Sequence, residues 1–491
     1  MMLSFDLGAS TGRLMLGQLA EGRLELVEVH RFPNRMLDTG GELHWDVHAL
    51  FREMKRGLSL CAERFTRKPA SIGIDTWGID FGLLDAEGRL LGLPHTYRDR
   101  RTEGAVEEFS RTISRERIYE LTGVQILPIN TLFQLQAMTR AEHPHLNQAR
   151  DLLFIPDLFN YFLTGVKQSE FTFATTSQLY NPITNEWAAE LFHALEINPD
   201  IMQRIVMPGS RVGPLSAAVC RATGLEAVPV IAVASHDTAS AVAAIPAPAD
   251  GFAYISSGTW SLVGIEAPAP LINEKTFKCN FTNEGGVGGR FRVLKNITGL
   301  WLLEECRRGW AQECEYTHEE LVRQAEISEP FRSVIDPDDP GFLNPRDMPL
   351  AIADYCRATN QFVPESIGEL TRCVFESLAL AYRRTLDEIA EIRPGKPVSE
   401  IRIIGGGSQN ALLCQMTADA TRLPVYAGPK EATAIGNLLV QAMADGMIAS
   451  LTELREVVRR SFPPVVYEPR QGARWDEAFA KENSHGNRSR Q

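Results

Sequence analysis

The fold class is decided near the start of the chain by the stretch 3–13, which reads Leu-Ser-Phe-Asp-Leu-Gly-Ala-Ser-Thr-Gly-Arg. Its apolar half, Leu3–Leu7, predicts a buried strand, and the small polar residues that follow predict a tight turn into a second strand, Arg13–Leu19. Glu21-Gly22 predicts another turn, which leads into a third strand, Arg23–Val29. The chain therefore opens with strands joined by short turns.

A helix and a further buried strand follow these turns. Apolar residues recur at helical spacing over Trp45–Phe65, and Asp46 can cap the first turn. The residues on this apolar face are Val47, Leu50, Phe51, Met54, Leu58 and Cys61. Ser71–Asp75 returns as a buried strand, so strands and helices alternate. This alternation predicts an α/β fold.

The pattern of the opening recurs in the second half of the chain. Gly251–Ser256 predicts a strand, Ser257-Gly258-Thr259 a polar turn, and Trp260–Ile265 the returning strand. The Pro-rich segment 245–251 lies between the two copies and breaks both helices and strands, so we expect a domain boundary there. Two related halves imply a cleft between them, where ligands tend to bind. The predicted divisions are an N-terminal domain over 1–245, a C-terminal domain over 246–465, and a C-terminal extension over 466–491 with a disordered tail from residue 481.

Length, composition and charge exclude several classes of protein. The 491 residues are 44 % hydrophobic and 23 % charged, as in soluble enzymes of two or three domains. The net charge of −12, with no basic run, argues against DNA or RNA as a partner. Asp237 stands in the middle of the longest apolar stretch, 228–245, so we expect no membrane span. No signal peptide opens the chain, and the eight cysteines lack any C-x-x-C spacing, so we expect a cytoplasmic protein with reduced thiols.

Two polar turns are candidate phosphate-binding loops. In Gly8–Arg13, backbone amides can point at phosphate oxygens while the Arg13 side chain adds a positive charge. Asp6, at the end of the first strand, suits a metal ion held through water beside a polyphosphate. Ser256–Trp260 forms the corresponding turn of the second half, so the two loops together can grip a triphosphate. Each loop is also compatible with an ordinary hairpin turn.

The segment 234–241, Ala-Ser-His-Asp-Thr-Ala-Ser-Ala, carries a candidate general base. It lies between an apolar strand, Val230–Val233, and an Ala-rich helix that starts near Asp237. The helix dipole favours the ionised carboxylate that a general base requires. The alternative is that Asp237 only caps the helix and that His236 is a structural histidine.

Two glycine-containing segments are candidate ligand sites. Gly78 lets a small ligand approach the backbone, and Trp77 offers an apolar face for a sugar ring, although a bulge with a core tryptophan fits the same pattern. Gly405–Asn410 follows the predicted strand Ile401–Ile404 and resembles the start of a dinucleotide-binding fingerprint, but Asn410 replaces its third glycine. This loop can still admit an adenine or a ribose against bare backbone.

The ordered set of motifs resembles the FGGY family of carbohydrate kinases, in the superfamily that includes hexokinase and actin. The matching blocks run from residue 6 to about residue 440 and so cover nearly the whole chain. They are 6–13, 74–81, 94–101, 234–241, 256–261, 282–286, 294–297 and 405–410. Each block is modest, but their order along the chain makes the resemblance specific.

The resemblance implies an α/β fold of two actin/hexokinase-like (ribonuclease H-like) domains with an ATP- and sugar-binding cleft between them. The implied reaction transfers the γ-phosphoryl group of ATP to O1 of L-rhamnulose, with Mg²⁺, in L-rhamnose catabolism. The implied proton acceptor is Asp237. The implied sugar contacts are Gly78, His236, Asp237, Thr238 and Asn296. The implied ATP contacts are Ala9, Ser10, Thr11, Gly12, Arg13, Thr259, Glu304 and Gly406.

Position 304 departs from the family pattern. It is Glu here where relatives have Gln, which would add negative charge near the nucleotide. We expect ATP and a small ketose as the binding partners of a monomer, with no nucleic acid and no membrane. The residues leave two alternatives open: a kinase for another ketose, such as L-fuculose or a ketopentose, and a sugar-sensing relative without catalysis.

Overall fold

The computed structural model describes residues 1–247, 250–311, 314–343, 345–470 and 472–489. The chain forms two compact units, each assembled from separate stretches of sequence. Unit 1 contains Met1–Pro246, Glu266–Val293 and Ala432–Ser461, and unit 2 contains Ala247–Ile265, Leu294–Glu431 and Phe462–Gln491. Unit 1 thus includes two segments that lie beyond the predicted N-terminal domain 1–245.

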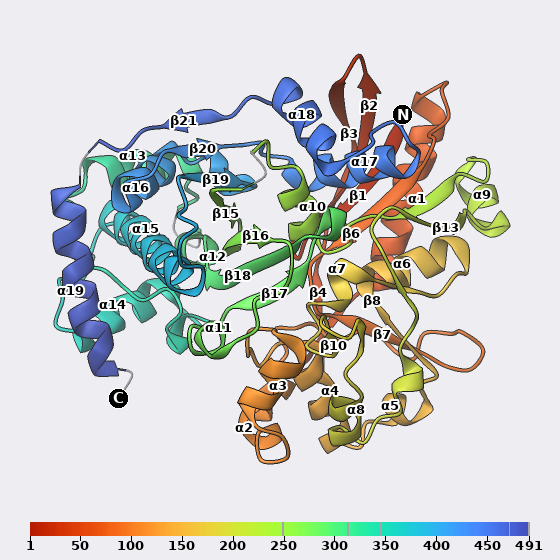
Figure 1. Cartoon of the computed structure of the whole chain (residues 1–491), viewed down its shortest axis with the longest axis horizontal. Coiled ribbons are helices and arrows are strands. Elements are labelled where there is room, and N and C mark those ends of the chain that lie inside the picture. Colours follow the sequence, from red (N-terminus) through yellow and green to blue (C-terminus); the bar gives the residue numbers. More distant parts are fainter. Residues whose placement is uncertain (248–249, 312–313, 344, 471, 490–491) are drawn as a thin grey trace. The chain divides into compact units, whose positions relative to one another are not determined.

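Unit 1 is built on a six-stranded sheet with the order β13-β14-β6-β1-β2-β3 (Figure 1). The strands are β1 (Met2–Leu7), β2 (Thr11–Ala20), β3 (Arg23–Pro33), β6 (Ile72–Thr76), β13 (Ser210–Pro214) and β14 (Pro229–Ala232). β1, β6 and β14 run parallel, whereas β2 is antiparallel to β1 and to β3. Every residue of β1 and β6 is buried, as expected for strands covered on both faces, and the predicted opening strands are confirmed within a few residues.

Helices and short strand pairs complete unit 1. Figure 1 shows α2, α3, α4 and α8 gathered away from the six-stranded sheet, and they share a separate apolar core that includes Phe109, Phe133 and Phe192. The helices of unit 1 are α1 (Val47–Arg64), α2 (Ala105–Phe109), α3 (Arg115–Thr122), α4 (Thr131–Arg140), α5 (Pro144–Gln148), α6 (Ile155–Thr164), α7 (Phe171–Ala174), α8 (Ala189–Ala194), α9 (Ala217–Thr223), α10 (Asp237–Ala243), α11 (Glu274–Lys278), α17 (Ala432–Ala444) and α18 (Leu451–Ser461). The short pairs are β4 (Met36–Thr39) with β5 (Glu42–Trp45), β7 (Phe81–Leu84) with β8 (Asp151–Phe154), β9 (Ser169–Glu170) with β12 (Ile205–Val206), and β10 (Tyr180–Asn181) with β11 (Glu186–Trp187).

Helix α1 forms as its sequence pattern predicts. Asp46 is the N-cap, and its carboxylate accepts a hydrogen bond from the backbone N–H of Ala49 at 2.8 Å. The predicted apolar face is buried at Val47, Leu50, Met54, Leu58 and Cys61, and Phe51 is partly buried against the same core. Helical spacing of apolar residues was therefore a sufficient signal for this helix.

Helix α17, near the end of the chain, belongs to the core of unit 1. Gln441 Nε2 donates to the backbone oxygen of Leu3 at 2.9 Å, and the Ser71 hydroxyl donates to Gln441 Oε1 at 2.8 Å. These bonds fix α17 against β1 and β6. Gly436 makes room for α10, since a Cβ atom there would lie 1.8 Å from the carbonyl oxygen of Ser240.

Unit 2 is built on a second sheet, in which β18, β16, β15, β19, β20 and β21 follow in this order. Their bounds are β15 (Phe252–Ser257), β16 (Trp260–Ala267), β18 (Phe291–Thr298), β19 (Glu400–Ile404), β20 (Val425–Ala427) and β21 (Val465–Tyr467). Unit 1 contains β17 (Thr282–Gly285), which neighbours β18. It also contains the last two residues of β16 and the first three residues of β18. β15 pairs antiparallel with β16 and parallel with β19, which repeats the β2-β1-β6 arrangement of unit 1.

Six helices are described in unit 2: α12 (Trp301–Trp310), α13 (His318–Ile327), α14 (Met348–Ala358), α15 (Ile367–Ile392), α16 (Ala411–Thr421) and α19 (Ala473–Ser489). α15 begins with a capping box formed by Ser366 and Glu369, and it contributes many of the fully buried residues of the core of this unit. The strand predicted at 401–404 is confirmed as β19, and helices α16 and α17 follow it along the chain.

The Pro-rich segment and the C-terminal tail are each described only in part by the structure. Pro248 and Ala249 of the Pro-rich segment lie outside the described residues, as do Arg490 and Gln491 of the tail. Helix α19 continues through Ser489, where the polar sequence predicts disorder from residue 481. The start of this helix is held in place because Trp475 is buried in the core of unit 2 and Asp476 pairs with Arg383 at 2.8 Å.

Among the helices that the structure describes, none is long and apolar enough to cross a membrane. All eight cysteines are free thiols, and five of them are buried.

Candidate active site

In unit 1, three loops emerge at the same edge of the sheet because their strands run parallel. The backbone N–H of Trp77 donates to the carbonyl of Leu7 at 3.2 Å, and that of Thr76 donates to the carbonyl of Ser235 at 2.9 Å. Thr76 also forms a parallel bridge with His236. The loops after β1, β6 and β14 therefore meet at the carboxyl ends of these strands, where ligands bind in open α/β sheets.

Two carboxylates lie side by side at this edge. Asp6 on β1 is the register partner of Asp75 on β6, and Asp6 forms an ion pair with Arg13 on β2. Asp75 is fully buried; Asn437 donates to its Oδ2 at 2.5 Å, whereas its Oδ1 has no hydrogen-bond partner among the described residues. Burial and the charges of Asp6 and Asp237 raise the pKa of Asp75 well above its usual range. A cation bound here would relieve both the missing contact and the repulsion.

The phosphate loop predicted at 8–12 is a short turn with a fixed backbone. Gly8 N–H donates to the carbonyl of Thr11 at 2.9 Å, and Asn34 holds the turn from outside, its side chain donating to Gly8 O and its backbone N–H to Ser10 O. Ser10 and Thr11 are exposed, and Ala9 is half-buried. Strand β2 begins at Thr11, so Gly12 and Arg13 belong to the strand rather than to the turn.

Asp237 is the first residue of α10, and His236 is the N-cap. The Asp237 carboxylate accepts hydrogen bonds from the backbone N–H of Thr238 at 2.5 Å and from its hydroxyl at 3.0 Å. The Asp237 side chain is 31 % exposed, and its Oδ1 lies 3.5 Å from His236 Nε2. Asp237 is therefore not the N-cap, and its carboxylate is accessible and lies beside an imidazole.

Buried groups that the sequence did not single out hold the segment before Asp237. Glu170 accepts hydrogen bonds from the backbone N–H of Ser235 at 3.1 Å and from the Thr172 hydroxyl at 2.5 Å. The Thr172 hydroxyl in turn accepts one from the backbone N–H of His236 at 3.3 Å. Burial raises the pKa of Glu170 to about 7. The short helix α7 thus positions the loop from which α10 starts.

His236 is also held on its other side. Its Nδ1 lies 3.3 Å from Glu284 Oε2 and 3.2 Å from an Nη2 of Arg292, and Glu284 and Arg292 pair with each other at 3.0 Å. Arg292 is fully buried, and its Nε donates to the carbonyl of Gly285. A strand segment about fifty residues further along the chain therefore fixes the His236 ring, which no local motif indicated.

Gly78 lies against His236, since a Cβ atom at Gly78 would come within 3.2 Å of His236 Nε2. Trp77 is 5 % exposed, packs on Trp45 with ring centroids 4.3 Å apart, and donates its Nε1–H to Asp80 at 2.9 Å. The structure therefore favours the core role for Trp77 over an open face for a sugar. Asp80, which also accepts from Trp45 at 2.7 Å, has its pKa raised by burial to about 6.

The other predicted contacts lie in unit 2. The backbone oxygen of Thr259 accepts hydrogen bonds from the N–H groups of Gly299 and Trp301, both at 3.1 Å, so the β15–β16 turn is tied to the start of α12. The loop after β19 packs on the same turn, because a Cβ atom at Gly407 would lie 2.0 Å from Ser257 Oγ. Gly406 is exposed, with no described atom within 4 Å of the place a Cβ would take. It presents bare backbone, as an approaching ring requires.

Glu304 and Asn296 complete the predicted set. Glu304 on α12 contacts Arg307 at 2.7 Å and His318 at 2.6 Å. Burial opposes ionisation of Glu304, but the contacts with His318 and Arg307 outweigh it and lower the pKa of the carboxyl. The extra negative charge expected at position 304 thus has a positive partner in the fold. Asn296 lies half-buried on β18, in the part that belongs to unit 2.

Comparisons with known proteins identify the family of this chain. Residues 1–244 match the model of the N-terminal domain of the FGGY family of carbohydrate kinases, and residues 253–444 match that of its C-terminal domain. The chain belongs to the FGGY family of carbohydrate kinases. The predicted α/β fold of two kinase domains and the enzyme class, a sugar phosphotransferase that uses ATP, are therefore confirmed.

Similar proteins with an assigned name include several rhamnulokinases. A rhamnulokinase from Bacteroides thetaiotaomicron is 49 % identical over 96 % of this chain and 97 % of its own length, and one from Halalkalibacterium halodurans is 44 % identical over 94 % and 97 %. Among solved structures, a xylulose kinase from Lactobacillus acidophilus has a TM-score of 0.82 at 17 % identity, covering 99 % of this chain and 97 % of its own. Plasmodium falciparum glycerol kinase with ADP has a TM-score of 0.79 at 16 % identity, with the same two coverages. These structures show the fold.

Proposed function

We propose that this carbohydrate kinase transfers the γ-phosphoryl group of ATP to O1 of L-rhamnulose and so gives L-rhamnulose 1-phosphate in L-rhamnose catabolism. The relatives named rhamnulokinase, similar over nearly the full length of both chains, support this substrate. The observation that carries the chemistry is the accessible carboxylate of Asp237 at the start of α10, beside His236 and Gly78.

In the proposed reaction Asp237 accepts the proton of the sugar hydroxyl as that oxygen attacks the γ-phosphorus. The bond from the γ-phosphorus to the ADP oxygen breaks, and ADP leaves with that electron pair. Phosphoryl transfer demands mainly positioning and charge neutralisation, plus one base. His236, Thr238 and Gly78, with Asn296, are the proposed sugar contacts. The proposed ATP contacts are Ala9, Ser10, Thr11, Gly12, Arg13, Thr259, Glu304 and Gly406.

Mg²⁺ fits the carboxylates of unit 1. Asp6 and Asp75 are neighbours in register, and the buried Asp75 Oδ1 lacks a hydrogen-bond partner among the described residues. Oxygen ligands of this kind are those that Mg²⁺ prefers. Asp6, directly or through water, and Asp75 are the residues that would hold the ion, which when bound would neutralise charge on the ATP phosphates.

We further propose that the enzyme works as a cytoplasmic monomer. Eight free thiols are typical of a reducing compartment, which supports the cytoplasm. Light scattering of the purified protein tests the monomer.

The decisive experiment measures ADP release with Mg²⁺-ATP and a panel of ketoses: L-rhamnulose, L-fuculose, L-ribulose and D-xylulose. We expect the highest kcat/KM with L-rhamnulose, and for Asp237→Asn a kcat about 10²- to 10⁴-fold lower. Asp200→Asn serves as the matched control, because Asp200 is exposed and is not among the proposed site residues. Preference for another ketose would exclude L-rhamnulose as the main substrate. Near-normal turnover of Asp237→Asn would exclude Asp237 as the general base.

A further inference from the structure

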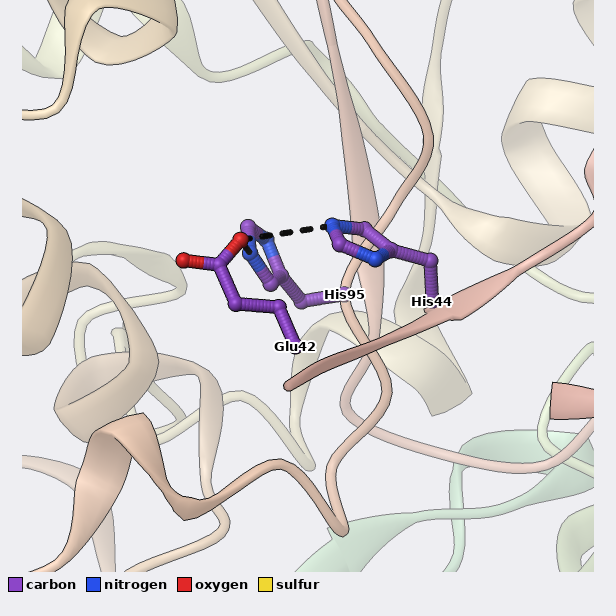
Figure 2. Close-up of side chains that lie close together, drawn as sticks. All are labelled: Glu42, His44 and His95. Atoms are coloured by element: carbon purple, nitrogen blue, oxygen red, sulfur yellow. Dashed lines mark hydrogen bonds and ion pairs between the residues drawn. The ribbon is translucent and has the colours of Figure 1, made fainter. Parts of the chain in front are cut away.

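A histidine–glutamate cluster lies in unit 1, outside the residues assigned to the kinase reaction. Glu42 and His44 stand two residues apart on β5, so their side chains share one face of the strand. His95 faces them from the neighbouring segment through an antiparallel bridge with His44. Figure 2 shows the Glu42 carboxylate directed toward both rings.

The donor atoms of these residues converge on a small volume. Glu42 Oε2 lies 3.3 Å from His95 Nε2 and 3.8 Å from His44 Nε2, and the donor atoms of the three residues all lie within 4.8 Å of one another. Two ligands about 2.0–2.1 Å from a tetrahedral Zn²⁺ are themselves about 3.3 Å apart. The Glu42–His95 pair, which is also a hydrogen bond, already has this spacing, and the other pairs would have to approach by at most about 1.5 Å to surround one ion. A separation of 3.8 Å is too long for a hydrogen bond, so the His44 contact is not explained by one.

The backbone holds the two imidazoles at this spacing. Trp45 N–H donates to the carbonyl of Pro94, and Thr96 N–H donates to the carbonyl of Leu43, both at 2.9 Å. These bonds flank the His44–His95 bridge on either side and fix its register. The ring centroids of His44 and His95 are 4.3 Å apart. His44 Nδ1 is buried with no hydrogen-bond partner among the described residues, so His44 is not a satisfied core histidine.

The local charges also favour a bound cation. The side chains of Glu42, Asp80 and Asp99 interact electrostatically with Arg101, so the carboxylates outnumber the guanidinium within this group. Arg101 itself bonds to Gln134 and lies near Asp99 rather than in the cluster.

We propose that Glu42, His44 and His95 bind one divalent transition-metal ion, with Zn²⁺ as the expected species. Two imidazoles and one carboxylate suit Zn²⁺ and its neighbours in the first transition row, and are a poor match for Mg²⁺. Water completes the coordination. The ion would join the β4–β5 hairpin to the segment 94–97.

An ion that links these two segments would affect the structure near the proposed sugar contacts. Trp45 follows His44 on β5, and its Nε1–H donates to Asp80; the backbone N–H of Tyr97 also donates to Asp80, at 3.2 Å. Asp80 in turn accepts from Trp77, the residue before Gly78. The bound ion would thus hold together the two segments that contact Asp80. Its role would be to stabilise the fold and not to take part in phosphoryl transfer.

The test uses the full chain without a polyhistidine tag. Bound metal is removed with EDTA, the EDTA is removed by dialysis, and no nucleotide is added. Titration with ZnCl₂ followed by calorimetry should give one site per chain, and Co²⁺ in place of Zn²⁺ should give visible absorption bands of a bound ion. Glu42→Gln, which alters an exposed side chain, and His44→Ala should each weaken Zn²⁺ binding at least tenfold. Millimolar Mg²⁺ should not displace the ion.

His48→Ala is the matched control, since His48 is exposed on α1 and stacks on Phe162 outside the cluster. It should bind Zn²⁺ like the unmodified protein. Zn²⁺ should also raise the melting temperature of the unmodified protein and of His48→Ala but not of the two cluster variants. The proposal is overturned if no site saturates at one ion per chain, or if Glu42→Gln and His44→Ala bind Zn²⁺ as tightly as His48→Ala does.

Discussion

Replacing Glu284 with Gln should destabilise the protein by about 3 kcal/mol, because it leaves a charge buried without its partner. Arg292 is fully buried and pairs with Glu284 at 3.0 Å, so solvent does not screen this interaction. Breaking such a pair from one side costs about 3–5 kcal/mol. The carbonyl of Gly285 and the His236 ring remain near the guanidinium, which places the expected cost at the lower end.

Urea unfolding of four proteins checks this value: the unmodified chain, Glu284→Gln, Arg292→Met, and the double variant. The double variant buries no unpaired charge, so it should be more stable than Glu284→Gln alone. A loss below about 1 kcal/mol in Glu284→Gln, the usual limit for exposed pairs, would refute the argument. So would strictly additive effects of the two substitutions, because they would show that the groups do not interact.

The same pair has a pH signature. Burial opposes ionisation of Glu284, but Arg292 and His236 more than offset it, so its pKa is lowered from the ordinary value of 4.5. A lowered carboxyl pKa contributes stability that is fully present above pH 4.5 and is lost as the pH falls through the lowered value. The stability difference between the unmodified chain and Glu284→Gln should therefore shrink in acid. An unchanged difference down to pH 3 would contradict this assignment.

Three further outcomes are expected. Gly436→Ala should destabilise unit 1 by about 1–3 kcal/mol in thermal or urea unfolding, because the new Cβ would collide with the carbonyl of Ser240; a gain in stability from the better helix former would contradict this packing. Tyr382→Phe should cost about 1–2 kcal/mol through loss of its buried 2.7 Å hydrogen bond with Ser261, and no measurable change would show that the bond adds nothing. The pKa of Glu170 is raised from 4.5 to about 7, so the folded state binds the proton more tightly than the unfolded state, and its contribution to stability should fall as the pH rises from 4.5 to 7. Unfolding midpoints at pH 5 and pH 7.5 should show this fall, and it should be smaller in Glu170→Gln.

The sequence was most informative where structure depends on neighbours in the chain. The hairpin after Leu7, the cap at Asp46 and the start of a helix at Asp237 each depend on residues within one or two turns. Local patterns of glycine, polar and apolar residues specify such features. The meeting of Asp237, Gly78 and the first polar turn at the carboxyl edge of the sheet is a finding of the structure, because it depends on the pairing of β1, β6 and β14.

Features set by distant contacts were not predictable from local patterns. Glu170 reads as an ordinary acidic residue, yet it is buried because it accepts hydrogen bonds from the loop of Ser235. Glu284 and Arg292 reach His236 through strands far along the chain. Trp77 fitted both a sugar platform and a core residue, and its packing on Trp45 decided between them. In each case the environment of the side chain depends on a contact with a residue outside its local sequence.

The composition of unit 1 from three stretches of chain has a consequence for protein synthesis. The hydrogen bond between Ser71 and Gln441 joins residues 370 positions apart, and α17 cannot reach β1 and β6 before the ribosome has made it. At about 5–20 residues per second, the sheet waits roughly 20–70 s for this helix. During that time the nascent chain exposes apolar strands that the finished protein buries. We therefore expect the yield of active protein in cells to depend on chaperones that bind unfinished chains, more strongly than its stability after folding would indicate.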